Sequence, residues 1–516
     1  MGSVSRWLFA VVFCGCCFIQ LAAQCPARPA SGTVVDDPFN ISSQAGKFSA
    51  QFVLARSVDQ QGYTHYCYQY TAAKGVVEAP TIRVNPGDEL ALTVVNNIKD
   101  NDATKMTMAM PENQRCGDGG PVSLDATNVH FHGLDVPPKC HQDDVINTLI
   151  QPGAGGFKYD MRINAYQPPG LYWYHPHVHG FTEFQVNGGA AGALIVGGIE
   201  KVRPEVAGLT ERVFVIRQQY LVPWSPGPYQ LTLNYQVAPL IGAPPIIQMK
   251  PGEKQFWRVA NATLQDFLSL QVQVNGKAAP LEMIALDGYP LAQTRNQNTI
   301  VIPPAGRAEF IVQAPPSGAP AIFYTTAYST GPTGNADLQQ TLAKIELSDK
   351  TDSAHMPAGS ASADETNLSN LFEQAPTAQR KLYFSEEFGG TNGPIQFYIT
   401  VDGQKQKVFE GNEQPVITTK VGAVEDWTIE NRALETHAFH IHQIHFMVME
   451  VDGKPVANHD LRDTIEIPYW EGKGPFHSVK VRMDFRDPAI AGTFLFHCHI
   501  LLHEDLGMMH KILVEP

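Results

Sequence analysis

The sequence has 516 residues, and it is short of basic side chains, of cysteine and of long helical patterns. Lys and Arg total 37 against 51 Asp and Glu, so the net charge is −14 and nucleic acid is a poor candidate partner. With 17% charged and 43% hydrophobic residues, the composition also excludes disordered and collagen-like proteins. The 43 Gly and 38 Pro instead imply many turns and favour a β-rich architecture.

A largely apolar run extends from Trp7 to Ala23, after a lone Arg6. The run is shorter than the roughly 20 apolar residues that a helix needs to cross a bilayer, and it ends in small residues. We therefore expect residues 1–23 to be a signal peptide rather than a membrane span. The mature protein is then secreted, extracellular or periplasmic.

Cysteine is scarce, with eight residues in the whole chain, and three of these lie within the predicted signal peptide. In an oxidising compartment, four of the remaining five could form two disulfides, whose pairing cannot be read from the sequence. One thiol is left over. The five are Cys25, Cys67, Cys116, Cys140 and Cys498.

Three segments of the chain align without a gap: residues 82–97, 247–262 and 417–432. A glycine turn followed by alternating apolar and polar residues is typical of a hairpin that enters a half-buried strand. We therefore predict three consecutive β-sandwich domains. A β-propeller is the alternative, but its repeats would span roughly 40 to 50 residues. The aligned positions are Gly87, Gly252 and Gly422, then Leu92, Trp257 and Trp427, then Asn96, Asn261 and Asn431.

The predicted domains span residues 45–198, 201–348 and 381–516. Residues 349–380 are rich in Ser, Ala, Thr and acidic side chains, which is typical of a linker.

Ten of the 18 histidines fall into four tight groups. On a strand, residues i and i+2 share a face, so each His-x-His pair presents two imidazoles to the same side and can grip a metal ion. For a single pair, a chance placement of polar residues is the simpler explanation. The groups lie at residues 130–132, 175–177, 437–442 and 497–503.

A second repeat relates two of these groups, because GLYWYHPH at 170–177 matches GTFLFHCH at 492–499. The counterpart in the middle domain, at residues 319–327, has no histidine. We therefore expect the first and last domains to face each other around a shared metal cluster, with the middle domain as a spacer.

Cys498 supplies a separate signal. If His497 and His499 point to one face of a strand, Cys498 points to the other, where His503 and Met508 follow at regular spacing. Together with His437, this gives two imidazoles, one thiolate and a thioether, which is the ligand set of a blue copper site. A zinc site would more often use two or more cysteines. A buried core thiol is the alternative, but it leaves the ligand spacing unexplained.

The four histidine motifs together resemble those of the three-domain multicopper oxidases, the laccase-like enzymes. They are HFHG at 130–133, HPH at 175–177, HAFHIH at 437–442 and HCHILLHEDLGMM at 497–509. Phe131, Ala438 and Gln443 stand where the family usually has Trp, Pro and Gly, but none of them replaces a ligand. The resemblance implies an all-β chain of three cupredoxin-like Greek-key β-sandwich domains.

By the same resemblance, the chain would hold four copper ions. The type 1 ion would be held by His437, Cys498, His503 and Met508, and the type 2 ion by His130 and His440. One type 3 ion would be held by His132, His175 and His499, and the other by His177, His442 and His497. Cys498 is bonded along the backbone to both His497 and His499, which gives electrons a short path to the cluster.

The function implied is one-electron oxidation of phenols or aromatic amines, coupled to the reduction of dioxygen to water. A metallo-oxidase acting on Cu(I) or Fe(II) is the alternative, and a non-catalytic copper-binding or cell-wall protein is a further one. Asp143 and Glu504 resemble the acidic residues that relay protons in the family, although each could instead be a solvated carboxylate or orient a histidine.

Other soft or imidazole side chains lie near these motifs. Met106, Met108 and Met110 alternate and could bind Cu(I), although a packing role is the simpler explanation. His179, His445 and His510 lie close to the motifs but off the ligand positions, so we expect them to be supporting residues.

Overall fold

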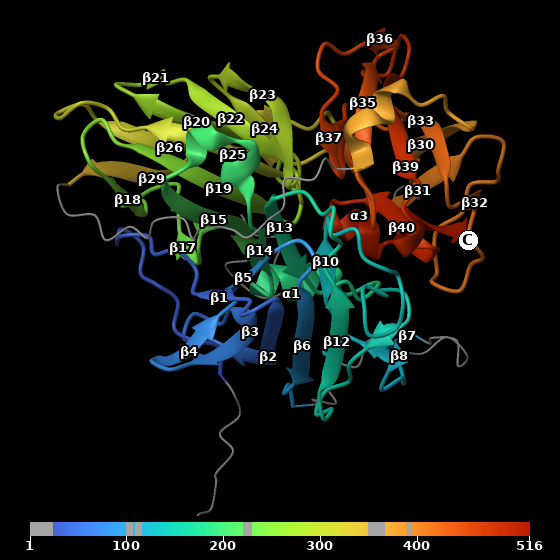
Figure 1. Cartoon of the computed structure of the whole chain (residues 1–516), viewed down its shortest axis with the longest axis horizontal. Helices are drawn as coiled ribbons and strands as arrows, with labels where there is room; N and C mark the ends of the chain where they lie inside the picture. The colour runs from blue at the N-terminus through green and yellow to red at the C-terminus, as the bar shows by residue number, and fades with distance from the viewer. Residues whose placement is uncertain (1–23, 100–106, 109–115, 220–229, 349–366, 390–394) are drawn as a thin grey trace, which may run out of the picture.

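The computed structural model describes residues 24–99, 107–108, 116–219, 230–348, 367–389 and 395–516. Within these ranges the chain is all-β and forms three consecutive cupredoxin-like sandwiches, as predicted (Figure 1). No helix among the described residues is long and apolar enough to cross a membrane. The predicted signal peptide at 1–23, and Met106 and Met110, lie outside the described residues.

The N-terminal domain packs two five-stranded sheets around a core that includes Phe52, Tyr68 and Tyr174. Strand β12 shows why: its residues alternate between buried and exposed, so one face covers the core. One sheet contains β1 (Asn40–Ser42), β5 (Thr81–Val84), β14 (Gly192–Val196), β13 (Gly170–His175) and β10 (His130–His132). The other contains β12 (Phe157–Arg162), β6 (Glu89–Asn96), β2 (Lys47–Val58), β3 (Thr64–Ala72) and β4 (Gly75–Glu78). Smaller elements are β7 (Thr107–Met108), β8 (Cys116–Gly117), β9 (Val122–Ser123), β11 (Thr148–Leu149) and α1 (Thr182–Gly188).

The middle domain is entered through α2 (Ile199–Val202) and η2 (Pro204–Val206). Its first sheet contains β17 (Gln236–Val237), β16 (Gln230–Leu233), β15 (Thr210–Gln219), β19 (Lys254–Ala262), β25 (Arg307–Gln313), β22 (Leu281–Leu286) and β23 (Tyr289–Gln297). The second contains β18 (Ile246–Met249), β29 (Gln340–Leu347), β26 (Ala321–Thr326), β20 (Leu268–Val274), β21 (Lys277–Ala278) and β24 (Ile300–Ile302). A short ribbon joins β27 (Tyr328–Ser329) to β28 (Ala336–Asp337).

The C-terminal domain is also a sandwich of two sheets. One sheet contains β31 (Ile395–Val401), β30 (Ala378–Phe388), β33 (Ala423–Asn431), β39 (His477–Phe485), β35 (Phe446–Val451), β36 (Lys454–Pro455) and β37 (Leu461–Arg462). The other contains β32 (Ile417–Lys420), β41 (Met509–Glu515), β40 (Gly492–Cys498), β34 (His437–Ile441) and β38 (Thr464–Ile467). The short helices are η3 (Asn367–Glu373), η4 (Pro488–Ile490) and α3 (Leu501–Asp505).

The end of the predicted linker is folded. Helix η3 and the start of β30 both fall within residues 349–380, and the Arg482 guanidinium donates to the carbonyls of Phe372 and Gln374, at 2.8 Å each. The described part of this segment is therefore attached to the C-terminal domain.

The three aligned segments connect the two sheets of each sandwich. Strands β5, β18 and β32 precede the glycine, and β6, β19 and β33 follow it in the opposite sheet. Gly87, Gly252 and Gly422 make the turn at φ of 84°, 71° and 92°, a conformation that favours glycine. The hairpin interpretation was therefore wrong, because alternation identifies a half-buried strand but not the strand with which it pairs.

The aligned asparagines explain the other end of the repeat. Each side-chain amide donates to two backbone carbonyls of its own domain, and each amide oxygen accepts from the backbone N–H two residues later. These bonds hold the end of each aligned strand in the same way. The carbonyl partners are Asp125 and Ile150 for Asn96, Asp266 and Ile302 for Asn261, and Glu435 and Ile467 for Asn431. The N–H donors are Ile98, Thr263 and Ala433.

Two disulfides form, Cys25–Cys67 and Cys116–Cys140, and Cys498 is a free, buried thiol. This confirms the expectation of two bridges and one unpaired cysteine.

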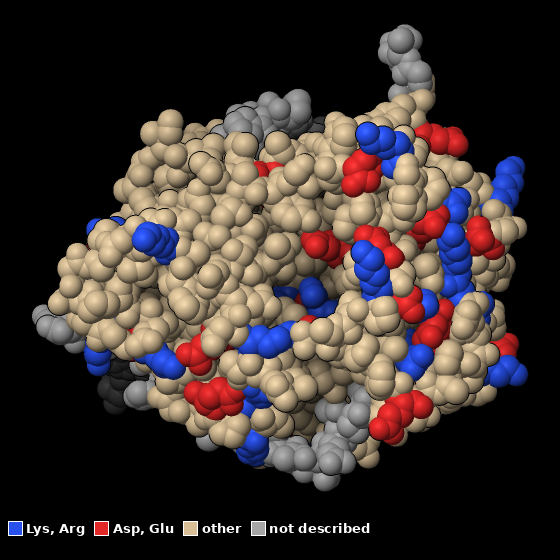
Figure 2. Space-filling view, turned by 90° about the horizontal axis from the view of Figure 1, so that it is seen from above, with Lys and Arg blue, Asp and Glu red and all other residues tan. Residues whose placement is uncertain are grey.

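The middle and C-terminal domains are joined by ion pairs. Arg295 on the middle domain bonds Asp460 at 2.7 Å, and Arg462 on the C-terminal domain bonds Asp287 at 2.7 Å. Figure 2 shows the surface hollowed between these two domains, with charged side chains of both signs around the hollow.

Candidate metal centre

The histidine pairs lie on matching strands of the two outer domains. In the N-terminal domain β10 runs antiparallel to β13 and sets His130 opposite His175. In the C-terminal domain β34 runs antiparallel to β40 and sets His440 opposite His497. All four side chains are buried. The middle domain's β26 occupies the equivalent position without a histidine.

Three groups of imidazoles combine residues from both outer domains. Within each group, one ring nitrogen of every residue lies within 4.8 Å of the others. None of the candidate metal-binding groups among the described residues includes a residue of the middle domain. The groups are His130, His132 and His440; His132, His175 and His499; and His177, His442 and His497.

The third group shows how closely the domains approach. The Nε2 atom of His497 lies 3.3 Å from Nε2 of His177 and 3.1 Å from Nε2 of His442. Three imidazoles from three separate segments therefore aim the same ring atom at one point.

Hydrogen bonds at the opposite ring nitrogen fix the tautomer of several of these histidines. Nδ1 of His175, His440 and His497 lies 2.8, 2.8 and 2.9 Å from a backbone carbonyl, which can only accept. Nδ1 of His130 lies 2.9 Å from a carboxylate oxygen of Asp143. Each Nδ1 must therefore donate, which leaves the lone pair on Nε2. The Nε2 atoms of His130, His175 and His440 are buried and have no hydrogen-bond partner in the described structure, which fits a bound metal ion.

The buried imidazoles are held neutral. Burial, reinforced by the neighbouring imidazoles, lowers the pKa of His177, His440 and His442 well below its usual value. Burial alone is the main cause at His497, whose pKa falls to about 3. The neutral ring is the form that binds a metal, so these histidines need not lose a proton first.

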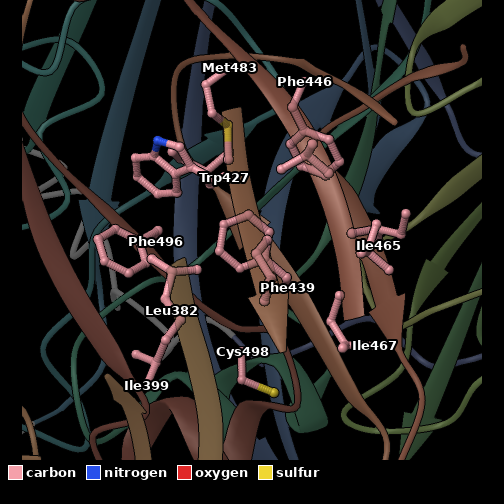
Figure 3. Packing of buried hydrophobic residues seen from close by; sticks show 14 of the residues in the cluster. Leu382, Ile399, Trp427, Phe439, Phe446, Ile465, Ile467, Met483, Phe496 and Cys498 are labelled. Carbon is pink, nitrogen blue, oxygen red and sulfur yellow. The ribbon is translucent and has the colours of Figure 1, made fainter. Parts of the chain in front are cut away.

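Cys498 ends strand β40, and its side chain lies on the face opposite that of His497, inside the core of the C-terminal domain. Its Sγ is 3.6 Å from Nδ1 of His437 and 3.9 Å from Nδ1 of His503, and these three residues form a separate candidate group. Figure 3 shows Cys498 at one end of the apolar cluster, near Phe439. Burial raises the pKa of the Cys498 thiol, so a thiolate there requires a nearby cation.

Met508 is tied to this group through the backbone. Its N–H donates to the carbonyl of His503 at 2.8 Å, and its carbonyl accepts from the N–H of Cys498 at 3.1 Å. The side chain is fully buried in the same core.

The two predicted acidic residues both touch the histidine cluster. Asp143 accepts from the Phe131 N–H at 3.0 Å and from the Gln443 side-chain amide at 2.6 Å, and it also contacts His130. Glu504 has one oxygen 3.5 Å from Nε2 of His177 and the other 3.3 Å from Nδ1 of His497. Burial, together with the charge of Asp505, raises the pKa of Glu504 well above its usual value.

Gln443 accounts for one departure from the family pattern. Its φ is 59°, in the left-handed region where glycine is the usual residue. Unlike glycine, Gln443 has a side-chain amide, which donates to Asp143 across the interface between the outer domains.

Three carboxylates next to the histidines were not predicted from the sequence. Asp463 has one side-chain oxygen 3.3 Å from Nε2 of His132, and it binds Arg307 of the middle domain. Glu386 lies 3.4 Å from Nε2 of His437, and Glu435 lies 3.6 Å from Nε2 of His503. Only Glu435, two residues before His437, lies next to a recognisable motif.

The three other histidines near the motifs lie outside the candidate metal groups of the described residues. His445 is buried between Asp463, Asp135 and the carbonyl of Asp287. His179 and His510 both lie against Phe409.

Known proteins resemble this chain over most of its length. Family models described as multicopper oxidase match residues 123–200, 217–348 and 389–516. A multicopper oxidase of Staphylococcus aureus is 25% identical over 92% of this chain and 94% of its own length. A laccase of Bacillus subtilis is 21% identical over 85% of this chain and 88% of its own length.

Solved structures share the fold. A multicopper oxidase of Campylobacter jejuni, described as a metallo-oxidase, matches with a TM-score of 0.68 and 23% identity, covering 95% of this chain and 96% of that one. The McoA multicopper oxidase of Aquifex aeolicus matches with a TM-score of 0.69 and 17% identity, covering 94% and 99%. The chain therefore belongs to the multicopper oxidase family and is a copper-dependent oxidoreductase that uses dioxygen as its electron acceptor.

Proposed function

We propose that this enzyme is laccase-like and withdraws single electrons from phenols or aromatic amines at a type 1 copper, reducing dioxygen to water at a trinuclear cluster. The observation that carries the proposal is the position of the free, buried thiol of Cys498. It lies between His437 and His503 and is joined through the backbone to His497 and His499, which belong to the interdomain groups.

Each ion has a set of residues that fits it. Four bound coppers would supply four electrons, the number needed to convert dioxygen to two waters. The type 1 ligands would be His437, Cys498, His503 and Met508, and the type 2 ligands His130 and His440. The type 3 ligands would be His132, His175 and His499 for one ion and His177, His442 and His497 for the other.

Two carboxyl groups are placed to handle protons. Burial and the charge of Asp505 raise the pKa of Glu504 above its usual value, which favours the protonated form, and its carboxyl group lies against His177 and His497. Asp143 is fixed by donors from Phe131 and Gln443, so it can both orient His130 and accept a proton. Burial of all these groups excludes bulk water from the cluster.

The electron-donor side carries two glutamates, Glu386 and Glu435, against the Nε2 edges of His437 and His503. A carboxylate in this place can take the proton that a phenol or aromatic amine loses as it is oxidised. The laccases of Bacillus subtilis and Haloferax volcanii among the relatives are in line with such donors.

The same glutamates favour a second candidate function, oxidation of Cu(I) or Fe(II), because carboxylate oxygens attract cations. The structural neighbour from Campylobacter jejuni is described as a metallo-oxidase. A non-catalytic copper-binding role is a weaker candidate, because the predicted ligand residues are all present.

The site of action is proposed to be outside the cytoplasm. Two disulfides are typical of an oxidising compartment, and the apolar run at residues 7–23 fits a secretory signal.

The test is oxygen uptake by the copper-loaded protein with a phenol, Fe(II) and Cu(I) measured in parallel. A preference for the phenol supports the laccase-like assignment, whereas a strong preference for a metal ion replaces it with the metallo-oxidase. No uptake with any donor, despite full copper loading, would instead favour a non-catalytic role.

A further inference from the structure

Arg307 lies where all three domains meet, and its side chain is fully buried. It belongs to β25 of the middle domain, but its Nε donates to the carbonyl of Leu171 in the N-terminal domain at 3.2 Å. Its two terminal nitrogens bond both carboxylate oxygens of Asp463 in the C-terminal domain, at 2.7 and 2.5 Å. Further bonds to the carbonyls of Asp287 and Ala305 satisfy the rest of the guanidinium.

Asp463 in turn contacts histidines of the cluster. The carboxylate oxygen that bonds Nη1 of Arg307 also lies 3.3 Å from Nε2 of His132 and accepts from the Thr464 hydroxyl at 2.8 Å. The backbone carbonyl of Asp463 accepts from Nδ1 of His440 at 2.8 Å. One residue thus holds two imidazoles that come from opposite domains.

The bond to His132 decides which ring nitrogen faces the cluster. Because Asp463 accepts from Nε2, the lone pair of His132 lies on Nδ1, which is buried and has no hydrogen-bond partner in the described structure. For His130, His175 and His440 the free atom is Nε2 instead. His132 therefore needs a hydrogen-bond acceptor at Nε2 to hold its ring with Nδ1 towards the cluster, and Asp463 is that acceptor.

We propose that Arg307, from the domain without copper ligands, is a positioning residue for the trinuclear cluster, acting through Asp463 on His132 and His440. This inference rests on the proposed copper-binding role of those histidines. A buried carboxylate without a cation would be strongly destabilised, and the planar guanidinium fixes both carboxylate oxygens at once. Lysine could balance the charge but could not impose this geometry.

The glycine of the HFHG motif makes room for the ion pair. A Cβ added at Gly133 would lie 2.6 Å from Nη2 of Arg307 and 2.6 Å from a carboxylate oxygen of Asp463. The φ of Gly133 is also 89°, which disfavours other residues. The motif that supplies His130 and His132 is therefore shaped around the Arg307–Asp463 pair, so the middle domain does more than separate its neighbours.

Arg258 provides a matched control. It is a buried arginine of the same domain, and it forms ion pairs with Glu211 and Glu309. Glu309 also accepts from the Leu171 N–H at 2.8 Å and so joins the same two domains. Neither glutamate belongs to a candidate metal group of the described residues.

The experiment compares copper-loaded wild-type protein with Arg307→Met, Arg307→Lys, Asp463→Asn and Arg258→Met. Copper content, blue absorption, the electron paramagnetic resonance signal of type 2 copper, the near-ultraviolet band of the type 3 pair and thermal unfolding are measured on each. We expect Arg307→Met and Asp463→Asn to keep the blue absorption but to change the type 2 and type 3 signals. Oxygen reduction should fall by roughly tenfold or more, and Arg307→Lys should recover only part of it. Arg258→Met should lower the unfolding temperature and leave the copper signals unchanged.

Two results would overturn the inference. The first is that Asp463→Asn and Arg307→Lys both fold and both give normal type 2 and type 3 signals. These two variants keep the test decisive if Arg307→Met does not fold. The second is the same spectroscopic change in Arg258→Met, which would mean that any weakening of the interface suffices. If the wild-type protein itself takes up no copper, the proposed function fails first, and the two failures are thereby distinguished.

Discussion

The Nε2 atoms of His177 and His497 lie 3.3 Å apart, although 320 positions separate the two residues and they belong to different domains. Neither domain alone assembles any of the three interdomain groups. These groups can bind a metal ion only when the outer domains are docked, so metal binding stabilises the docked arrangement.

Removal of copper should weaken the interface between the outer domains. Because a ligand that binds only the folded state stabilises it by about 3 to 4 kcal/mol at 100 to 1,000 times its Kd, the copper-free protein should unfold at a lower temperature. Scanning calorimetry before and after chelation, with copper restored as the control, measures the difference. Identical unfolding curves would contradict the coupling.

Cys498→Ser should abolish the blue absorption and the oxidation of every donor, because the hydroxyl does not replace the thiolate between His437 and His503. The interdomain groups contain no atom of Cys498, so the type 2 signal should remain. Absorption and paramagnetic resonance spectra provide the readout. Retained blue colour would disprove the assignment of the ligand.

Asp143→Asn and Glu504→Gln should each slow oxygen reduction and leave the blue absorption intact, since both carboxyl groups touch the cluster but not Cys498. A loss of roughly 10²- to 10⁴-fold is typical when a proton-transfer group is removed. Stopped-flow reoxidation of the reduced enzyme isolates this step. Unchanged turnover in both variants would exclude the relay.

Glu386→Gln should reduce the oxidation of Fe(II) and Cu(I) more than that of a neutral phenol, because the carboxylate next to His437 attracts cations. The change should raise KM for the metal ions. Glu430→Gln, which removes a carboxylate that pairs with Lys381 and Arg432, controls for the loss of one charge. An equal effect on all donors would argue against cation binding here.

Asp266 and Asp337 should make stability depend on pH. Burial raises the pKa of Asp337 to about 9, with a further contribution from Asp266, and burial raises the pKa of Asp266 to about 6. The unfolded chain releases these protons near pH 4. The pair therefore stabilises the protein fully at low pH, and this contribution is lost as pH rises towards 9.

Asp337→Asn should remove most of this dependence, because an amide can still accept from the Phe267 N–H without ionising. Urea unfolding at pH 5 and at pH 9 should show a smaller decrease in the variant, with each unit of pKa shift worth about 1.4 kcal/mol. Asp160→Asn, at an exposed carboxylate paired with Lys158, is the control. A variant with the same pH profile as the wild type would refute the role of the pair.

The sequence predicted the features that depend on local periodicity. A His-x-His pair on a strand puts two imidazoles on one face whatever its neighbours are, so the four groups and the opposite direction of Cys498 followed from spacing alone. The aligned glycines and asparagines similarly marked three sandwiches, because each copy needs a left-handed turn and the same bonds from its asparagine.

Only the tertiary structure decided which residues surround the strand faces that carry the histidine pairs. That the aligned turns cross between sheets, that Arg307 reaches Asp463 from another domain, and that Glu386 approaches His437 depend on contacts between residues far apart in the chain. Such contacts leave no periodic signal, because the free energy of a buried ion pair is set by the partners that folding brings together and not by sequence spacing.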